Sequence, residues 1–155
     1  MTGSDPTIEP PSLGAFSGKV HRLPLRVWFE DTDITGIVYH ANYVRYLERG
    51  RSAMLALAGA GQRAVWDAGE GAYAITELTL RYRRPARLED VLVVESRLTA
   101  LRPVSCVIQQ RVMRDVEVLV EAEVTAAFLD ASGRPRRQPA SWMERFRPLL
   151  KTGDE

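Results

Sequence analysis

Apolar residues recur at every second position through most of the chain after residue 70, and this alternation is the strongest constraint on its fold. The alternation runs through four segments, at 72–84, 91–101, 105–114 and 116–129. The last segment places its apolar side chains on one face and its glutamates on the other. One apolar face and one solvated face are typical of an antiparallel sheet, and the connections between the last three segments are short enough for hairpins. Residues 22–30 alternate in the same way and add a fifth strand.

One segment follows the helical period instead. Between residues 40 and 58, Tyr43, Leu47 and Met54 recur at helical spacing, which predicts one long helix. Gly50 lies in the middle of this helix, where glycine costs about 1 kcal/mol relative to alanine. A close approach of the sheet or of a partner backbone would explain the glycine, and so would simple tolerance.

A five-stranded sheet with one apolar face needs a cover, and the helix at 40–58 is the best candidate. We therefore predict an α+β fold, in which an antiparallel sheet of about five strands wraps around one long central helix. Because one helix is a thin cover, we expect a second subunit to complete the sheet edge or the helix end. Ser141 and Glu144 have the spacing of a capping box and predict a short C-terminal helix.

The composition excludes several classes of protein. The 155 residues include 21 basic and 20 acidic side chains, so the balance does not favour nucleic-acid binding. The single cysteine, Cys106, rules out an intrachain disulfide and favours a cytoplasmic setting. No segment has the roughly 20 apolar residues that span a bilayer. Two histidines and one cysteine, widely separated, predict neither a metal site nor another cofactor.

The first 18 residues contain three prolines, three glycines and no periodic apolar pattern. This composition predicts a disordered leader over residues 1–18. We expect residues 19–150 to form a single domain, which is an ordinary size for one.

The segment at 30–42 places Asp31 and Asp33 between the first predicted strand and the central helix. A helix N-terminus offers unpaired backbone N–H groups and the positive end of the helix dipole, which can stabilise an oxyanion that forms on a carbonyl. A carboxylate beside it can act as a general base or as a nucleophile. Turn or helix capping by the two aspartates is the alternative interpretation.

The run from Phe29 to Tyr43, FEDTDITGIVYHANY, closely resembles the signature of hotdog-fold thioesterases of the 4-hydroxybenzoyl-CoA type. It is nearest to the Tol-Pal-associated acyl-CoA thioesterase (YbgC-like) branch, and the similarity continues through residues 46–51 and 82–90. The resemblance implies a hotdog fold and hydrolysis of acyl-CoA to a free acid and CoA. It also implies a homodimer or homotetramer with the active site at a subunit interface, without stable membrane insertion.

By position, the resemblance assigns Asp33 as the catalytic carboxylate, which either activates water or attacks the thioester itself. The backbone N–H of His40 matches the group that polarises the thioester carbonyl, and its side chain would orient substrate or assist proton transfer. Tyr39 would line the acyl pocket. Glu48, two helical turns beyond His40, matches a supporting acid, and a solvated helix glutamate is the alternative.

We expect arginines at the mouth of the pocket, because guanidinium groups bind phosphates such as those of CoA. Arg83 and Arg84, beside Pro85, and Arg102, in a predicted hairpin turn, are the candidates, and solvated strand ends are the alternative. Cys106 alternates with apolar residues, which favours a buried structural thiol over a nucleophile.

Two other functions compete with thioester hydrolysis. A hotdog hydratase typically places its Asp five residues before a His, whereas Asp33 and His40 lie seven residues apart. The second is a non-catalytic subunit that binds acyl-CoA or acyl-carrier protein, or a scaffold linked to phospholipid or envelope machinery. The intact Asp33 motif disfavours this alternative without excluding it.

Overall fold

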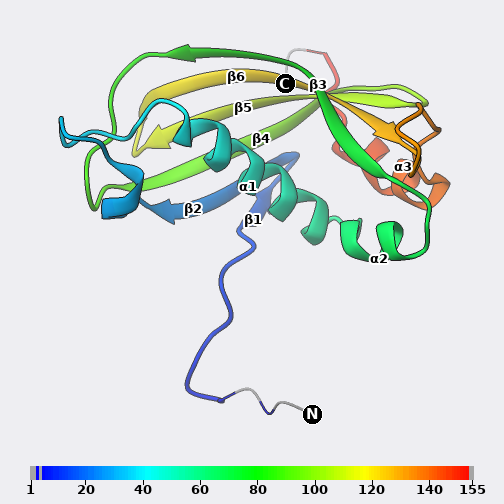
Figure 1. Ribbon diagram of the computed structural model, residues 1–155, viewed down its shortest axis with the longest axis horizontal. Helices are drawn as coiled ribbons and strands as arrows, with labels where there is room; N and C mark the ends of the chain where they lie inside the picture. The colour runs from blue at the N-terminus through cyan, green and yellow to red at the C-terminus, as the bar shows by residue number, and fades with distance from the viewer. Residues whose placement is uncertain (1–2, 4, 154–155) are drawn as a thin grey trace.

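The computed structural model describes residues 3 and 5–153, and its main feature is an antiparallel six-stranded sheet (Figure 1). The strand order is β1-β2-β4-β5-β6-β3, so the two longest hairpins lie in the middle of the sheet and β3 forms one edge. The strands are β1 (Ala15–Ser17), β2 (Val20–Arg26), β3 (Ala72–Tyr82), β4 (Val91–Leu101), β5 (Ser105–Arg114) and β6 (Glu117–Leu129).

Helix α1 (Asn42–Leu57) lies across one face of this sheet, as the sequence predicts (Figure 1). Its buried side chains, among them Tyr46 and Leu47, pack against Val94 of β4 and Val112 of β5. Two shorter helices, α2 (Gln62–Asp67) and α3 (Ala140–Phe146), lie near the far end of α1. The predicted α+β class, with one long helix on an antiparallel sheet, is confirmed.

Gly50 marks the closest approach of α1 to the sheet. A Cβ atom at this position would lie 2.5 Å from Cγ1 of Val94 and 3.2 Å from Nε2 of Gln110. The same approach lets Gln110 donate to the Leu47 carbonyl at 2.9 Å and accept from the buried Arg51 at 3.0 Å. Close approach of the sheet therefore explains the glycine, and tolerance is not needed as an explanation.

The first predicted strand, at residues 22–30, differs from β2 at both ends, because β2 begins two residues earlier, at Val20. Strand β2 stops at Arg26, and Phe29–Asp31 forms a single 3-10 turn in place of the predicted strand end. The turn forms because the Asp31 carboxylate accepts the Trp28 backbone N–H at 2.8 Å, which holds the chain back on itself.

The expectation of a disordered leader is wrong at its C-terminal end, where Ala15–Ser17 forms strand β1 on the edge of β2. Gly14 permits this pairing, because its φ of +72° suits glycine and a Cβ atom would lie 2.0 Å from the Arg22 carbonyl oxygen. The buried His21 also contacts the Leu13 carbonyl through Nε2 at 2.7 Å. Residues 1, 2 and 4 of the predicted leader lie outside the described residues.

Strand β3 contains an irregularity that the alternation did not reveal. Its pairing with β6 shifts between Ile75 and Glu77, so Ile75 lies opposite Ala126 on the apolar face, together with Leu78. A strict period of two places Ile75 with Glu77 on the solvated face, and this prediction is wrong. The predicted C-terminal helix is present, but it begins at Ala140 and Ser141 makes no capping hydrogen bond.

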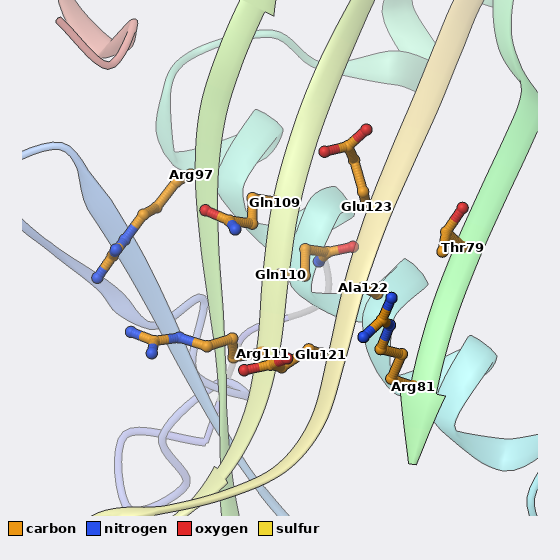
Figure 2. A pocket seen from close by; sticks show the side chains of 9 residues that line it. All are labelled: Thr79, Arg81, Arg97, Gln109, Gln110, Arg111, Glu121, Ala122 and Glu123. Carbon is orange, nitrogen blue, oxygen red and sulfur yellow. The ribbon is translucent and has the colours of Figure 1, made fainter. Parts of the chain in front are cut away.

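The face of the sheet opposite α1 is the solvated one, as the glutamates predict. Figure 2 shows its charged side chains projecting from four neighbouring strands. Glu95 of β4 is buried among them and forms ion pairs with Arg22 at 2.6 Å and Arg111 at 3.2 Å. Because its charge is paired on both sides, this burial is compatible with a stable sheet.

Candidate functional site

The loop between β2 and α1 is a small hairpin that carries the predicted catalytic residues. The Tyr39 N–H donates to the Asp31 carbonyl at 2.9 Å, and the Asp33 N–H donates to the Ile37 carbonyl at 3.1 Å. Gly36 closes the tip through its N–H and the Asp33 carbonyl at 3.0 Å. The hairpin places Asp33 near its tip and delivers the chain to the start of α1.

The two aspartates of this loop have different environments. Asp31 is buried and its carboxylate caps the 3-10 turn, which confirms the capping interpretation for this residue. Asp33 is exposed, and its carboxylate accepts the Thr35 backbone N–H at 2.8 Å and also the Thr35 hydroxyl, so the turn interpretation holds for this residue as well. The hydrogen bonds from Thr35 lower the pKa of Asp33, and the electrostatic influence of His40 acts on this pKa in the same direction. Asp33 therefore carries an ionised carboxylate in the hairpin that precedes His40.

His40 stands just before the first turn of α1. Its ring packs on Tyr39, with ring centroids 4.5 Å apart, and on Tyr82 of β3, at 6.4 Å. Within the part of the chain that the structure describes, no acceptor takes the backbone N–H of His40. This N–H is therefore available to a ligand at the positive end of the helix.

A cavity of about 360 Å³ adjoins His40. Arg83 and Arg84 line it, although Arg83 pairs with Glu121 at 2.9 Å and Arg84 with Glu117 at 3.1 Å. The full lining consists of Ile37, Val38, His40, Tyr43, Tyr82, Arg83, Arg84 and Pro85. The structure therefore brings two of the three predicted arginines to the histidine.

Four predicted residues do not line this cavity. Asp33 lies in the hairpin and Tyr39 packs on His40. Glu48 and Arg102 lie elsewhere in the chain.

Glu48 pairs with Arg51 and lines a separate cleft of about 450 Å³ between α1 and β3. Arg102 follows the last residue of β4. The first residue of β4 lies at the end of the strand nearer the hairpin, where the Val27 N–H donates to the Asp90 carbonyl. Eleven strand residues span about 36 Å, so Arg102 is not part of this site within one chain.

The sequence profile of the thioesterase-like superfamily matches residues 27–149 of the chain. The chain belongs to this superfamily. The match contains the hairpin, α1 and the strands β3 to β6. The family resemblance drawn from residues 29–43 is thereby confirmed.

Curated members of the thioesterase-like superfamily are similar over most of the chain. The acyl-CoA thioester hydrolase YbgC of Escherichia coli O6:H1 is 38% identical over 128 residues, which cover 81% of this chain and 95% of the relative. YbgC of Haemophilus influenzae is 34% identical over 108 residues, which cover 70% of this chain and 79% of the relative. A chloroplastic acyl-acyl carrier protein thioesterase of Arabidopsis thaliana, ATL3, is 30% identical, covering 91% of this chain and 75% of the relative.

Solved thioesterase structures share the fold. A probable thioesterase from Bartonella henselae superposes with a TM-score of 0.74 at 30% identity, over 77% of this chain and 99% of the other. The 4-hydroxybenzoyl CoA thioesterase from Pseudomonas sp. strain CBS-3 has a TM-score of 0.73 at 24% identity, over 81% of this chain and 98% of that one, and shows the fold alone. The predicted hotdog architecture is confirmed. Among residues 3 and 5–153, no helix has the length and apolar character needed to cross a membrane.

Cys106 is expected to resist thiol reagents in the native thioesterase domain. It is 4% exposed, and burial raises the pKa of its thiol to about 11, so the reactive thiolate is scarce near neutral pH. Ellman's reagent should label the urea-unfolded chain at one thiol and leave the native protein unlabelled over minutes. Rapid labelling of the native protein would contradict the buried structural role that the sequence predicts.

Two residues of this site were given no role by the sequence. The Tyr82 hydroxyl donates to the His40 carbonyl at 2.8 Å, and the Asn42 side chain donates to the Asp31 carbonyl at 2.8 Å. Both lie inside segments that resemble the family. Their contacts are to backbone atoms far away in the sequence, so the side-chain pattern carried no signal of the role.

Proposed function

We propose that the protein is an acyl-CoA thioesterase that hydrolyses acyl-CoA to a free acid and CoA. The observation that carries the proposal is the backbone N–H of His40 at the start of α1, which has no acceptor among the described residues, in a chain whose preceding hairpin holds the ionised Asp33 carboxylate. Family membership and the thioesterase names of the relatives support it. These two groups supply the base and the oxyanion donor that thioester hydrolysis needs.

The reaction follows from these roles. Asp33 takes a proton from water as the water oxygen bonds to the thioester carbonyl carbon, and the His40 N–H donates to the oxyanion that forms. When the intermediate collapses, the carbon–sulfur bond breaks and the CoA thiolate takes up the proton. In the second route, Asp33 attacks the carbonyl itself and the carbon–sulfur bond breaks to release the CoA thiolate. Water then hydrolyses the mixed anhydride, which releases the acid and restores the Asp33 carboxylate. The His40 side chain would orient substrate or assist the proton transfer.

The cavity beside His40 supplies candidate substrate contacts. Arg83 and Arg84 each have guanidinium donors beyond those used in their ion pairs, and phosphate oxygens of CoA would accept them. We assign Tyr39, which packs on His40, to the acyl side of the site. Glu48 lies in the neighbouring cleft, where it holds Arg51 and would contact the far part of an acyl group.

The decisive experiment is a panel of acyl-CoA and acyl-carrier-protein thioesters, with release of free thiol as the readout. Short aliphatic, long aliphatic and aromatic acyl groups should be included, and the buried Cys106 keeps the protein's own contribution low. Turnover of at least one CoA thioester is expected. Tight binding without turnover would favour the non-catalytic binding or scaffold function, and hydration of an enoyl-CoA would favour a hydratase.

The acyl group of the substrate is carried either by CoA or by acyl-carrier protein. The Arabidopsis relative is named an acyl-acyl carrier protein thioesterase and covers 91% of this chain, which is why both carriers belong in the panel. The Tol-Pal association and the cytoplasmic setting implied by the sequence remain predictions.

We infer that the working enzyme is a homodimer or homotetramer with the active site at a subunit interface. Strand β3 is a sheet edge of 11 residues, a length that leaves many backbone groups ready to pair with another strand. Exposed apolar side chains surround the edge and the hairpin, including Ile75 at 45%, Phe29 at 81% and Ile34 at 103% exposure. A second copy would cover both regions.

Introducing charge on the inward face of β3 should break this assembly. Ile75→Glu combined with Leu78→Glu places two carboxylates where apolar contact is expected, and sedimentation velocity should show a shift towards monomer with loss of turnover. Thr79→Lys, on the solvated face of the same strand and opposite Glu123, is the control for added charge at this edge. An oligomer of unchanged size in the double variant would contradict the inferred interface.

A further inference from the structure

The hydroxyl of Tyr82 donates a hydrogen bond to the His40 carbonyl, in place of the backbone bond that a regular helix would make there. In a regular helix the Val44 N–H would donate to the His40 carbonyl, but it donates to the Ala41 carbonyl at 3.2 Å instead. The His40 carbonyl therefore accepts no hydrogen bond from the helix backbone, all of which lies within the described residues. The Tyr82 hydroxyl donates to that carbonyl at 2.8 Å. The orientation of His40 at the start of α1 therefore depends on a side chain from β3.

Tyr82 can hold this position because its ring is held in turn. It is the last residue of β3 and pairs in register with Val120 of β6. Its ring packs edge-on against Tyr43 of α1, with centroids 5.6 Å apart. The phenol is thus presented by the sheet and braced by the helix, which limits the freedom of its hydroxyl.

A second bond ties the helix to the other arm of the hairpin. The Asn42 side chain donates to the Asp31 carbonyl at 2.8 Å, and the same carbonyl accepts the Tyr39 N–H at 2.9 Å. Asp31 lies two residues before Asp33 and is buried. Asn42 therefore fixes the arm that carries Asp33 relative to the first turn of α1.

We propose that Tyr82 and Asn42 are positioning residues, which hold the His40 N–H and the Asp33 carboxylate in the geometry that thioester hydrolysis requires. The inference rests on the proposed function, because it concerns the alignment of its two reacting groups. Both groups are exposed in the chain, so local burial does not fix them and hydrogen bonds must. A misplacement of about 1 Å can lower a rate by about 100-fold.

Tyr82→Phe is the main test, because it removes one hydroxyl and keeps the ring. We expect kcat to fall between about 10-fold and about 100-fold, with KM within about twofold of wild type and the melting temperature Tm little changed, since only one exposed hydroxyl is lost. Tyr73→Phe is the matched control: it lies near the other end of β3, and its hydroxyl also donates to a protein oxygen, that of Gln138. It should leave kcat unchanged.

Asn42→Ala tests the second tie and is expected to give the same signature, a loss in kcat with KM and Tm preserved. It decides the question on its own if the tyrosine variant folds poorly. A kcat within about twofold of wild type in both variants would overturn the inference, as would a kcat loss that Tyr73→Phe reproduces or that a comparable fall in Tm accompanies. Failure of the proposed function looks different, because the wild-type protein itself would then release no thiol from any thioester.

Discussion

Asp33→Asn is expected to lower kcat for acyl-CoA hydrolysis by about 100-fold to about 10,000-fold, the range for loss of a general base. The amide keeps the size of the side chain and an oxygen for Thr35, but it cannot accept a proton from water or attack a carbonyl. Because the Asp33 carboxylate is exposed, the variant should fold and melt as the wild type does. Thiol release and thermal unfolding, measured on the same preparations, test both parts.

Asp130→Asn is the matched control for this variant. Asp130 also lies in an exposed turn, where its carboxylate accepts the Ser132 hydroxyl at 2.6 Å and the Ser132 N–H at 2.9 Å. These hydrogen bonds lower the pKa of Asp130, as those from Thr35 lower that of Asp33. Asp130→Asn should keep full turnover. Near-full turnover of Asp33→Asn on every acyl-CoA that the wild type cleaves would remove Asp33 from the mechanism.

Gly50→Ala is expected to reduce the free energy of unfolding by about 1–3 kcal/mol, the usual cost of overpacking a core. Alanine would gain about 1 kcal/mol of helix propensity. Against this gain, its Cβ would stand 2.5 Å from Cγ1 of Val94, on a β-branched side chain with little freedom to move. The steric cost should exceed the gain, and the displaced α1 would also strain the buried contact between Gln110 and Arg51.

Urea unfolding of both proteins at one concentration measures this difference, since an oligomer makes apparent stability concentration-dependent. Gly61→Ala is the control, because a Cβ atom there meets no other atom within 4 Å and the residue does not have a positive φ. Gly61→Ala should change stability little. If Gly50→Ala proved as stable as wild type, the close contact of α1 with β4 would not constrain the fold as the structure indicates.

The sequence predicted the regular elements well, because each has a periodic pattern with a local cause. Alternation identified β3 to β6 within a few residues, and the helical period identified α1. The resemblance around residues 29–43 indicated the family and assigned roles to Asp33 and His40. The structure places His40 just before α1 and Asp33 in the hairpin that leads to it. Their catalytic roles remain to be tested.

Other features depended on contacts between distant segments, which no local pattern encodes. Strand β1 forms because Leu13 and Gly14 meet β2, and Ile75 faces inward because β3 shifts its register on β6. The difference between Asp31 and Asp33 has another origin. Each carboxylate accepts a backbone N–H from within three residues, and only Asp31 is buried.

Periodicity and side-chain chemistry are properties of the chain, so the order of its residues is sufficient to establish which elements form and which residues carry charge near the helix start. Which of these residues meet depends on how the elements pack: Arg83 joins His40 whereas Arg102 lies about 36 Å along β4 from the hairpin. Tyr82 reaches the His40 carbonyl across 42 residues of sequence. No local pattern encodes such a hydrogen bond, because it joins a side chain to a backbone atom whose position is set by the packing of the helix on the sheet.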